Sequence, residues 1–268
     1  MDTNSSKRSE PLVLAESRDL AGGTATVLTL NRPEQRNPLD KGTVRALNDE
    51  VDAALADDTA RAVIITGAPP AFSAGGDLRG YLELYRDPGA FRAFLEDIRT
   101  LFDKLEQSRL VSVAAVNGTC VAGGFEMTLA CDLVVMSDDA KMGDGHLKYW
   151  QLPGGGGSQR LPRAIGTAGA KRLLLTQELL SAEQCLQIGL VADVSTPASL
   201  LDEAVRLADR VTTAPEATIV TLKDLLGIAE NSPLSEGIGH EIDTLVNYTT
   251  QPGGVAYQGL ERFLQRRR

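Results

Sequence analysis

The stretches Phe72-Ser73-Ala74-Gly75-Gly76-Asp77-Leu78 and Asn117-Gly118-Thr119-Cys120-Val121-Ala122-Gly123-Gly124-Phe125-Glu126 each follow a predicted strand and lead into a predicted helix. The strands before them, residues 61–67 and 111–116, are apolar and rich in β-branched residues, as buried strands are. Asp77 is placed to cap the helix that follows the first stretch. Because small residues dominate both turns, their backbones stay open to close approach by a ligand.

Strands and helices alternate on both sides of these stretches. Residues 12–16 and 24–30, separated by Gly22-Gly23, predict a hairpin. Such alternation predicts an α/β fold of parallel βαβ units with both faces of the sheet covered. The other predicted elements are a helix capped by Asp40 that carries Val44, Leu47, Val51 and Leu55, a helix with an apolar stripe from Phe91 to Leu105, a helix from Gly123-Gly124 through Ala130, a strand over Leu133–Met136, a capping-box helix start at Ser181-Ala182-Glu183-Gln184, and a short strand over 189–194.

The pattern changes near residue 198, where the strand signal ends. Helices are predicted near 200–212, 215–229, 233–248 and 254–266. Several of them have apolar faces with no predicted strand to cover them, so they are expected to pack on the core or on another subunit. The predicted organisation is a flexible lead over 1–10, a core over 11–197 and a helical region over 198–268.

Composition and charge argue against several function classes. The 268 residues carry a formal net charge of −9, which disfavours a nucleic-acid-binding surface. The cysteines Cys120, Cys131 and Cys185 have no CxxC spacing, and only two histidines are present, so reduced core cysteines are expected and a metal site is not. The polar start has no apolar signal core, and no apolar run is long enough to span a bilayer. The sequence therefore predicts a cytoplasmic protein without a membrane partner.

The glycine turns do not match the common nucleotide-binding motifs. No glycine precedes Lys-Ser or Lys-Thr at P-loop spacing, and no dinucleotide fingerprint follows a strand. A helix that begins at Gly123 presents unpaired N–H groups, which suit an anionic ligand atom. The first turn, at Gly75-Gly76, could also be an ordinary strand-to-helix turn if it stood alone.

Glu126 is unusual for its surroundings. Between Val111 and Met136 the only charged residues are Glu126 and Asp132, and Asp132 is explained as a turn or cap at a helix-to-strand junction. Burial would raise the pKa of Glu126 and suit it to proton transfer. The alternative is that Glu126 pairs with a distant arginine or lysine.

Taken in order, these motifs resemble the crotonase superfamily, the enoyl-CoA hydratase/isomerase family. The resemblance extends from about residue 12 to 266, and the motifs together are far more specific than any one alone. The residues that carry it are Leu30-Asn31-Arg32-Pro33, the two stretches quoted above with Ala130-Cys131-Asp132, the run Leu152-Pro153-Gly154-Gly155-Gly156-Gly157-Ser158-Gln159-Arg160-Leu161, the segments Ser181-Ala182-Glu183 and Gly189-Leu190-Val191, and Gln258-Gly259-Leu260-Glu261-Arg262-Phe263-Leu264.

The resemblance implies a crotonase-like spiral of ββα units, a C-terminal helical trimerisation region and a homotrimer or hexamer. It implies an acyl-CoA thioester substrate, as in fatty acid metabolism, and no separate cofactor, because coenzyme A is part of the substrate. The N–H groups of Gly76 and Gly123 match the family's oxyanion hole, which polarises the thioester carbonyl. The backbone near Arg36, Ala74 and Gly76 matches positions that bind CoA.

The sequence departs from the family's hydratases at one catalytic position. Those enzymes use two glutamates; Glu126 matches the first, whereas the second position holds His146. A histidine can act as acid or base near neutral pH. The hypothesis is that Glu126 orients or deprotonates water for attack at C3, while His146 supplies the C2 proton or shares the water. His146 could instead only line the pocket, Asp144 is a weaker candidate for the acid, and Trp150 is expected to reshape the acyl pocket.

Hydration of a 2-enoyl-CoA, or its reversal, is the favoured reaction. Double-bond isomerisation ranks lower, because it often relies on a carboxylate where this chain has His146. Decarboxylation or hydrolysis stays open, since one oxyanion hole supports many reactions. A non-catalytic acyl-CoA-binding protein is the remaining alternative, and the pairing of Glu126 with Gly123 argues against it.

Overall fold

The computed structural model describes residues 10–251 and 253–265, so nearly all of the predicted lead over 1–10 lies outside the described residues. Within them, the main sheet has the order β1-β2-β3-β5-β7-β10. β1 and β2 form the predicted antiparallel hairpin, and the remaining neighbours are parallel. The strands are β1 (Val13–Leu20), β2 (Gly23–Leu30), β3 (Ala60–Gly67), β5 (Val111–Val116), β7 (Leu133–Ser137) and β10 (Asp193–Ser195).

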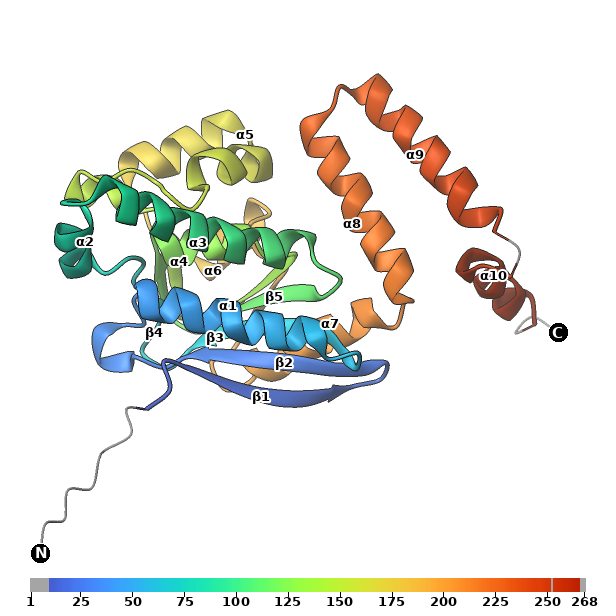
Figure 1. Cartoon of the computed structure of the whole chain (residues 1–268), viewed down its shortest axis with the longest axis horizontal. Coiled ribbons are helices and arrows are strands. Elements are labelled where there is room, and N and C mark those ends of the chain that lie inside the picture. Colours follow the sequence, from blue (N-terminus) through green and yellow to red (C-terminus); the bar gives the residue numbers. More distant parts are fainter. Residues whose placement is uncertain (1–9, 252, 266–268) are drawn as a thin grey trace, which may run out of the picture.

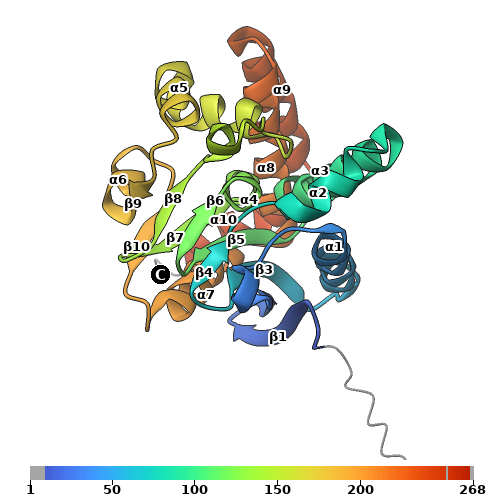
Figure 2. The same cartoon turned by 90° about the vertical axis from the view of Figure 1, so that its left-hand side faces the viewer.

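A second, smaller sheet lies beside the first and has the order β4-β6-β8-β9 in the described chain. β4 (Ala71–Ser73), β6 (Thr119–Val121) and β8 (Lys141–Gly143) each follow a strand of the main sheet within a few residues, and β9 (Leu180–Ser181) closes the edge. The repeated strand pairs build the spiral expected from the resemblance (Figure 2). Residue patterns alone did not predict these strands, because two or three residues are too few to show a periodicity.

Side-chain oxygens cap the helices where the sequence predicted. Asp40 accepts a hydrogen bond from the Thr43 N–H (2.8 Å). The pair Ser181 and Gln184 forms the predicted capping box. The helices are α1 (Lys41–Ala56), α2 (Leu78–Leu84), α3 (Pro88–Gln107), α4 (Gly123–Leu129), α5 (Gly157–Thr176), α6 (Ala182–Gln187), α7 (Leu200–Thr212), α8 (Glu216–Asn231), α9 (Leu234–Thr249) and α10 (Val255–Gln265), with short 3-10 turns at Pro33–Gln35 and His146–Tyr149.

Both faces of the main sheet are covered, as parallel sheets require. On β3, Val63 and Ile65 belong to the apolar cluster that also contains the buried residues of α1 and α3. The alternating residues Ala62 and Ile64 belong to a separate cluster with the buried side of α7. This period of two places α1 and α3 on one face and α7 on the other (Figure 1).

The predicted strand over 189–194 was wrong in its position. Gly189 adopts a left-handed conformation (φ +79°) that ends the turn after α6. The Leu190 N–H still bonds back to the Cys185 carbonyl, and the chain first joins the sheet when the Ala192 N–H bonds the Val134 carbonyl (2.8 Å). Pairing with β7 therefore begins only at Asp193.

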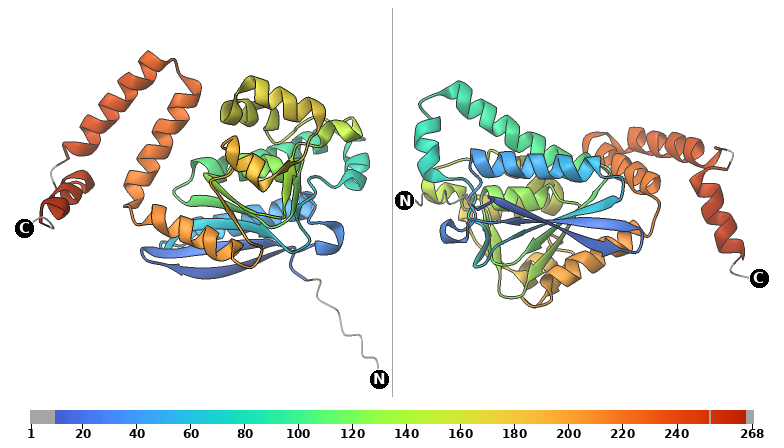
Figure 3. Two further views of the ribbon diagram at one scale, coloured as in Figure 1. Left: turned by 180° about the vertical axis from the view of Figure 1, so that it is seen from behind. Right: turned by 60° about the horizontal axis from the view of Figure 1, so that its bottom comes forward.

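The last three helices, α8 to α10, form an arm that stands away from the sheets (Figures 1 and 3). The arm exposes large apolar side chains. The helix before it, α7, packs on the main sheet although it follows residue 198. The predicted boundary at residue 198 between core and helical region therefore stays a prediction. Of the helices in the described ranges, none combines the length and apolar character needed to cross a membrane. The exposed apolar side chains include Leu222, Leu226, Leu234, Ile238, Ile242, Leu245 and Leu260.

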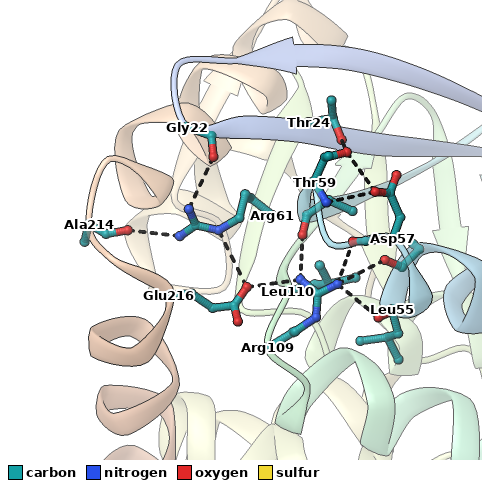
Figure 4. A network of polar contacts seen from close by, with 12 residues as sticks. Gly22, Thr24, Leu55, Asp57, Thr59, Arg61, Arg109, Leu110, Ala214 and Glu216 are labelled. Carbon is teal, nitrogen blue, oxygen red and sulfur yellow. Dashed lines mark hydrogen bonds and ion pairs between the residues drawn. The ribbon is translucent and has the colours of Figure 1, made fainter. Parts of the chain in front are cut away.

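Two arginines and one glutamate join the start of this arm to the core (Figure 4). Arg109 donates to carbonyls at the end of α1, those of Leu55 (3.0 Å) and Asp57 (2.7 Å), which a helix terminus leaves unpaired. Its other nitrogen donates to Glu216, the first residue of α8 (3.0 Å). Arg61 also pairs with Glu216 and donates to the Ala214 carbonyl (3.0 Å). The network fixes where α8 leaves the body.

Candidate active site

A cavity of about 450 Å³ lies where the small sheet meets α2, α3 and the segment 145–155. It brings together Ala74, Gly76, Gly123, Glu126 and His146, all of which the sequence singled out. The rest of its wall is mainly apolar and aromatic, as ligand pockets usually are. The residues of that wall include Tyr81, Tyr85, Phe91, Leu95, Ile98 and Leu152.

The N–H groups of Gly76 and Gly123 lie side by side at this cavity. A Cβ built on Gly123 would lie 3.8 Å from the Gly76 nitrogen. Gly75 between the two turns has φ +83°, and a Cβ there would lie 2.6 Å from the Ala122 Cβ. Within residues 10–251 and 253–265, neither N–H has a hydrogen-bond acceptor. Two adjacent unpaired donors can bind one oxygen that becomes negative.

The residue before Gly123 has an unusual backbone conformation. Ala122 has φ +50° and ψ −124°, a combination that side chains disfavour and that costs about 1–3 kcal/mol. Its N–H donates to the Asp144 carbonyl (2.7 Å), which anchors the strained peptide to the end of β8. The strained residue directly precedes Gly123, which lines the cavity.

Glu126 is buried and has one carboxylate oxygen occupied. Its Oε1 accepts hydrogen bonds from the N–H groups of Gly155 (2.9 Å) and Gly157 (2.8 Å). These amides, and not the distant arginine or lysine considered above, are its hydrogen-bond partners in the described chain. A Cβ on Gly155 would lie 2.7 Å from Phe102, so only glycine lets this loop approach the carboxylate. Oε2 remains free for chemistry and lies 3.7 Å from His146 Nε2.

The environment of Glu126 favours proton transfer. Burial raises its pKa above the ordinary value, although the Gly157 amide, the His146 charge and the Gly155 amide lower it in part. A carboxylate with a raised pKa is a better base, because it binds a proton more strongly.

His146 is held by Asp144, two residues earlier. The Asp144 carboxylate lies 2.8 Å from His146 Nδ1 and accepts a hydrogen bond from the His146 backbone N–H (3.1 Å). Because Nδ1 donates a hydrogen bond to Asp144, the other ring nitrogen, Nε2, is the one that faces Glu126. Burial alone would lower the pKa of His146, but the hydrogen bond to Asp144 and the charges of Glu126 and Asp144 raise it overall. Asp144 is therefore placed to orient the histidine, and its role as a replacement acid stays a prediction.

Asp132, the other charged residue of this apolar stretch, connects elements of the fold. It accepts a hydrogen bond from the Ser112 N–H (2.8 Å) and pairs with Lys223 of α8 (2.8 Å). Its side chain therefore joins β5 to the arm, which is more than the turn or cap that the sequence indicated.

Two further predicted residues lie at the edge of the site. Arg36 is not part of the cavity wall; its carbonyl accepts a hydrogen bond from the Ala74 N–H (2.8 Å), which keeps the two proposed CoA-binding backbones together. Trp150 lies at the rim with 93% of its surface exposed. It borders the entrance, so whether it reshapes the acyl pocket stays a prediction.

Sequence reasoning missed the two amides that hold Glu126 and the tyrosine beside Gly76. The run Gly154–Gly157 was a visible signal for the amides, since consecutive glycines allow close backbone approach. Tyr81 gave no signal, because it lies in a short helix with no motif of its own.

The strand-pair spiral, with two free N–H groups and a buried carboxylate at one cavity, defines an enzyme of the crotonase superfamily. Residues 21–268 match the Enoyl-CoA hydratase/isomerase family. The chain belongs to this family and is a hydratase-like enzyme.

Individual relatives agree with this assignment. A putative enoyl-CoA hydratase of Thermus thermophilus is 36% identical over 91% of this chain and 96% of its own. The 2,3-dehydroadipyl-CoA hydratase of Escherichia coli is 33% identical over 90% of this chain and 92% of its own. The crystal structure of an enoyl-CoA hydratase from Bacillus anthracis superposes with a TM-score of 0.85 at 26% identity, covering 95% of this chain and 96% of that one.

Proposed function

We propose that the protein adds water to a 2-enoyl-CoA, or removes it from a 3-hydroxyacyl-CoA. The observation that carries the proposal is the facing pair of Glu126 Oε2 and His146 Nε2, 3.7 Å apart beside two free N–H groups. This gap is too long for a direct hydrogen bond and suits two groups that act on one bound molecule.

The thioester oxygen binds to the N–H groups of Gly76 and Gly123 in this proposal. Its negative charge grows as water attacks C3, so both hydrogen bonds strengthen toward the transition state. The adjoining backbone of Arg36 and Ala74 binds the CoA portion. Water is added without net oxidation, and the proposed reaction therefore needs no redox cofactor.

Two proton transfers complete the reaction. Glu126 Oε2 takes a proton from water while the hydroxide oxygen bonds C3, and the electron pair of the C2–C3 double bond moves onto the thioester as an enolate. His146 Nε2 then gives its proton to C2. The proton on Glu126 returns to His146 through a water molecule that lies beside the pair and hydrogen-bonds to both, which restores both groups.

The experiment uses the purified protein with a short and a long trans-2-enoyl-CoA. Loss of the enone absorbance with a product heavier by one water supports hydration. An isomer of unchanged mass, free CoA thiol or loss of carbon dioxide from a suitable acyl-CoA would identify isomerisation, hydrolysis or decarboxylation instead. Binding without any product would identify the non-catalytic alternative.

The pH profile of kcat/KM tests the role of His146. The proposed form has Glu126 ionised and His146 protonated, so activity falls below the pKa of the first and above the pKa of the second. Both pKa values are raised, so both limbs lie at higher pH than free side chains would give. His146→Gln should lower kcat by about 100-fold and abolish the alkaline limb. The two groups titrate as a pair, and an alkaline limb that survives in this variant contradicts the role of His146.

A homotrimer or a dimer of trimers is part of the proposal. The exposed apolar faces of α8 and α9, with Leu222, Leu226, Ile238 and Ile242, support burial against other copies. Light scattering should give three or six times the monomer mass, and a monomer at assay concentration would contradict it.

A cytoplasmic location is also proposed, supported by three unpaired cysteines, and cell fractionation tests it.

A further inference from the structure

The Tyr81 hydroxyl occupies the space beside Gly76 where a side chain would otherwise stand. A Cβ built on Gly76 would lie 2.1 Å from that hydroxyl oxygen and 2.4 Å from the ring carbon that bears it. Gly76 supplies one of the two free N–H groups, and Tyr81 lines the same cavity as Glu126 and His146. The phenol oxygen is therefore in contact with the backbone of the proposed oxyanion hole.

Aromatic packing fixes the ring in this position. Its centroid lies 5.9 Å from that of Phe91 and 6.0 Å from that of Phe94, both edge-on. Tyr85, the residue that follows α2, also packs against the ring, with its centroid 5.8 Å away. A ring held by three neighbours can present its hydroxyl without first losing much conformational freedom.

The hydroxyl has no hydrogen-bond partner among the residues that the structure describes. The hydroxyl oxygen is not fully buried, and it is therefore open to the cavity that Tyr81 lines. Tyr85 differs, because its hydroxyl bonds to the side chain of Gln151 across the cavity entrance. Of these two tyrosines, only Tyr81 keeps a free donor next to Gly76.

The phenol is suited to donate and not to accept a proton. Burial and the nearby charge of Glu126 raise the pKa of Tyr81 to about 12. It therefore stays protonated at every pH at which the enzyme would be assayed.

We infer that Tyr81 is a catalytic residue that donates a third hydrogen bond to the thioester oxygen, alongside Gly76 and Gly123. The inference rests on the proposed function, because it needs a thioester in that cavity. A carbonyl oxygen accepts two hydrogen bonds, whereas an enolate oxygen has room for a third. The bond with Tyr81 therefore strengthens as charge develops, which lowers the barrier more than it tightens binding.

The test compares Tyr81→Phe with the parent protein and with Tyr257→Phe, which removes an exposed hydroxyl on α10, outside the cavity. Tyr81→Phe retains the packed ring and removes only the hydroxyl. We expect kcat for enoyl-CoA hydration to fall about 10- to 100-fold with KM changed less than threefold. Bound acetoacetyl-CoA provides a second readout, because its enolate absorbs in the near ultraviolet. Its enolate fraction should fall in Tyr81→Phe and stay at the parent level in Tyr257→Phe.

The outcomes separate the two proposals. If the parent protein turns over no enoyl-CoA, the proposed function fails. If the parent is active and Tyr81→Phe keeps its kcat and enolate signal, the inference about Tyr81 is overturned. A rise in KM alone also overturns it, since Tyr81 would then only line the cavity. An equal loss of enolate signal in Tyr257→Phe overturns it too, since the effect would then not be specific to the cavity.

Discussion

Replacing Glu126 with glutamine should lower kcat for enoyl-CoA hydration by about 100- to 10,000-fold, the usual contribution of a positioned acid–base group. The glutamine carbonyl oxygen can still accept the N–H groups of Gly155 and Gly157, now at 2.9 and 2.8 Å from Oε1. The amide nitrogen then replaces the oxygen that faces His146 and cannot take a proton from water. Because these anchors persist, we expect the fold and KM to change little.

The same substitution should alter the titration of His146. The negative charge of Glu126 helps to raise the pKa of that histidine, so its removal moves the alkaline limb of any residual activity to lower pH. Rates across pH for the parent and Glu126→Gln measure this shift. Glu83→Gln is the charge-matched control, because Glu83 is exposed on α2 and, among the described residues, its only ion pair is with exposed Arg86. Parent-like activity in Glu126→Gln would contradict the proposed base.

Much of the fold follows from patterns that the sequence makes visible. The hairpin, the buried strands at 61–67 and 111–116, and the caps at Asp40 and Ser181 were predicted from residue types and spacing, and the structure confirms them. The small sheet was not visible in this way. Its short strands form only because they pair with strands distant in the sequence, and such pairing leaves no pattern in the neighbouring residues.

The site was predictable only to the level of single residues. Glu126 stood out because a charge within an apolar stretch needs a reason. Which of its oxygens is free depends on the Gly155 and Gly157 amides, which lie about thirty residues away in sequence. The contact between Asp144 and His146 depends on the loop after β8, and sequence spacing alone does not specify loop geometry.

Replacing Gly75 with alanine should disrupt the oxyanion hole without touching an acid or base. Gly75 has φ +83°, and the new Cβ would lie 2.6 Å from Ala122 Cβ and 3.0 Å from the Gly123 nitrogen. Relief of this clash moves the Gly76 and Gly123 turns apart. The N–H groups of Gly76 and Gly123 could then no longer bind the same oxygen. This should reduce kcat by about 100- to 1,000-fold, the cost of removing one such hydrogen bond. Initial rates at saturating enoyl-CoA measure it.

Gly189→Ala is the matched control, because it shares the backbone strain but not the clash. Gly189 has φ +79°, and no described atom lies within 4 Å of a Cβ built there. In urea denaturation, Gly189→Ala should lose about 1–2 kcal/mol of unfolding free energy from the left-handed conformation. Gly75→Ala should lose that amount and more, because the clash adds to it. Only Gly75→Ala should lose turnover. Equal loss of kcat in both would attribute the effect to general destabilisation, whereas its restriction to Gly75→Ala ties catalysis to the spacing of the two N–H groups.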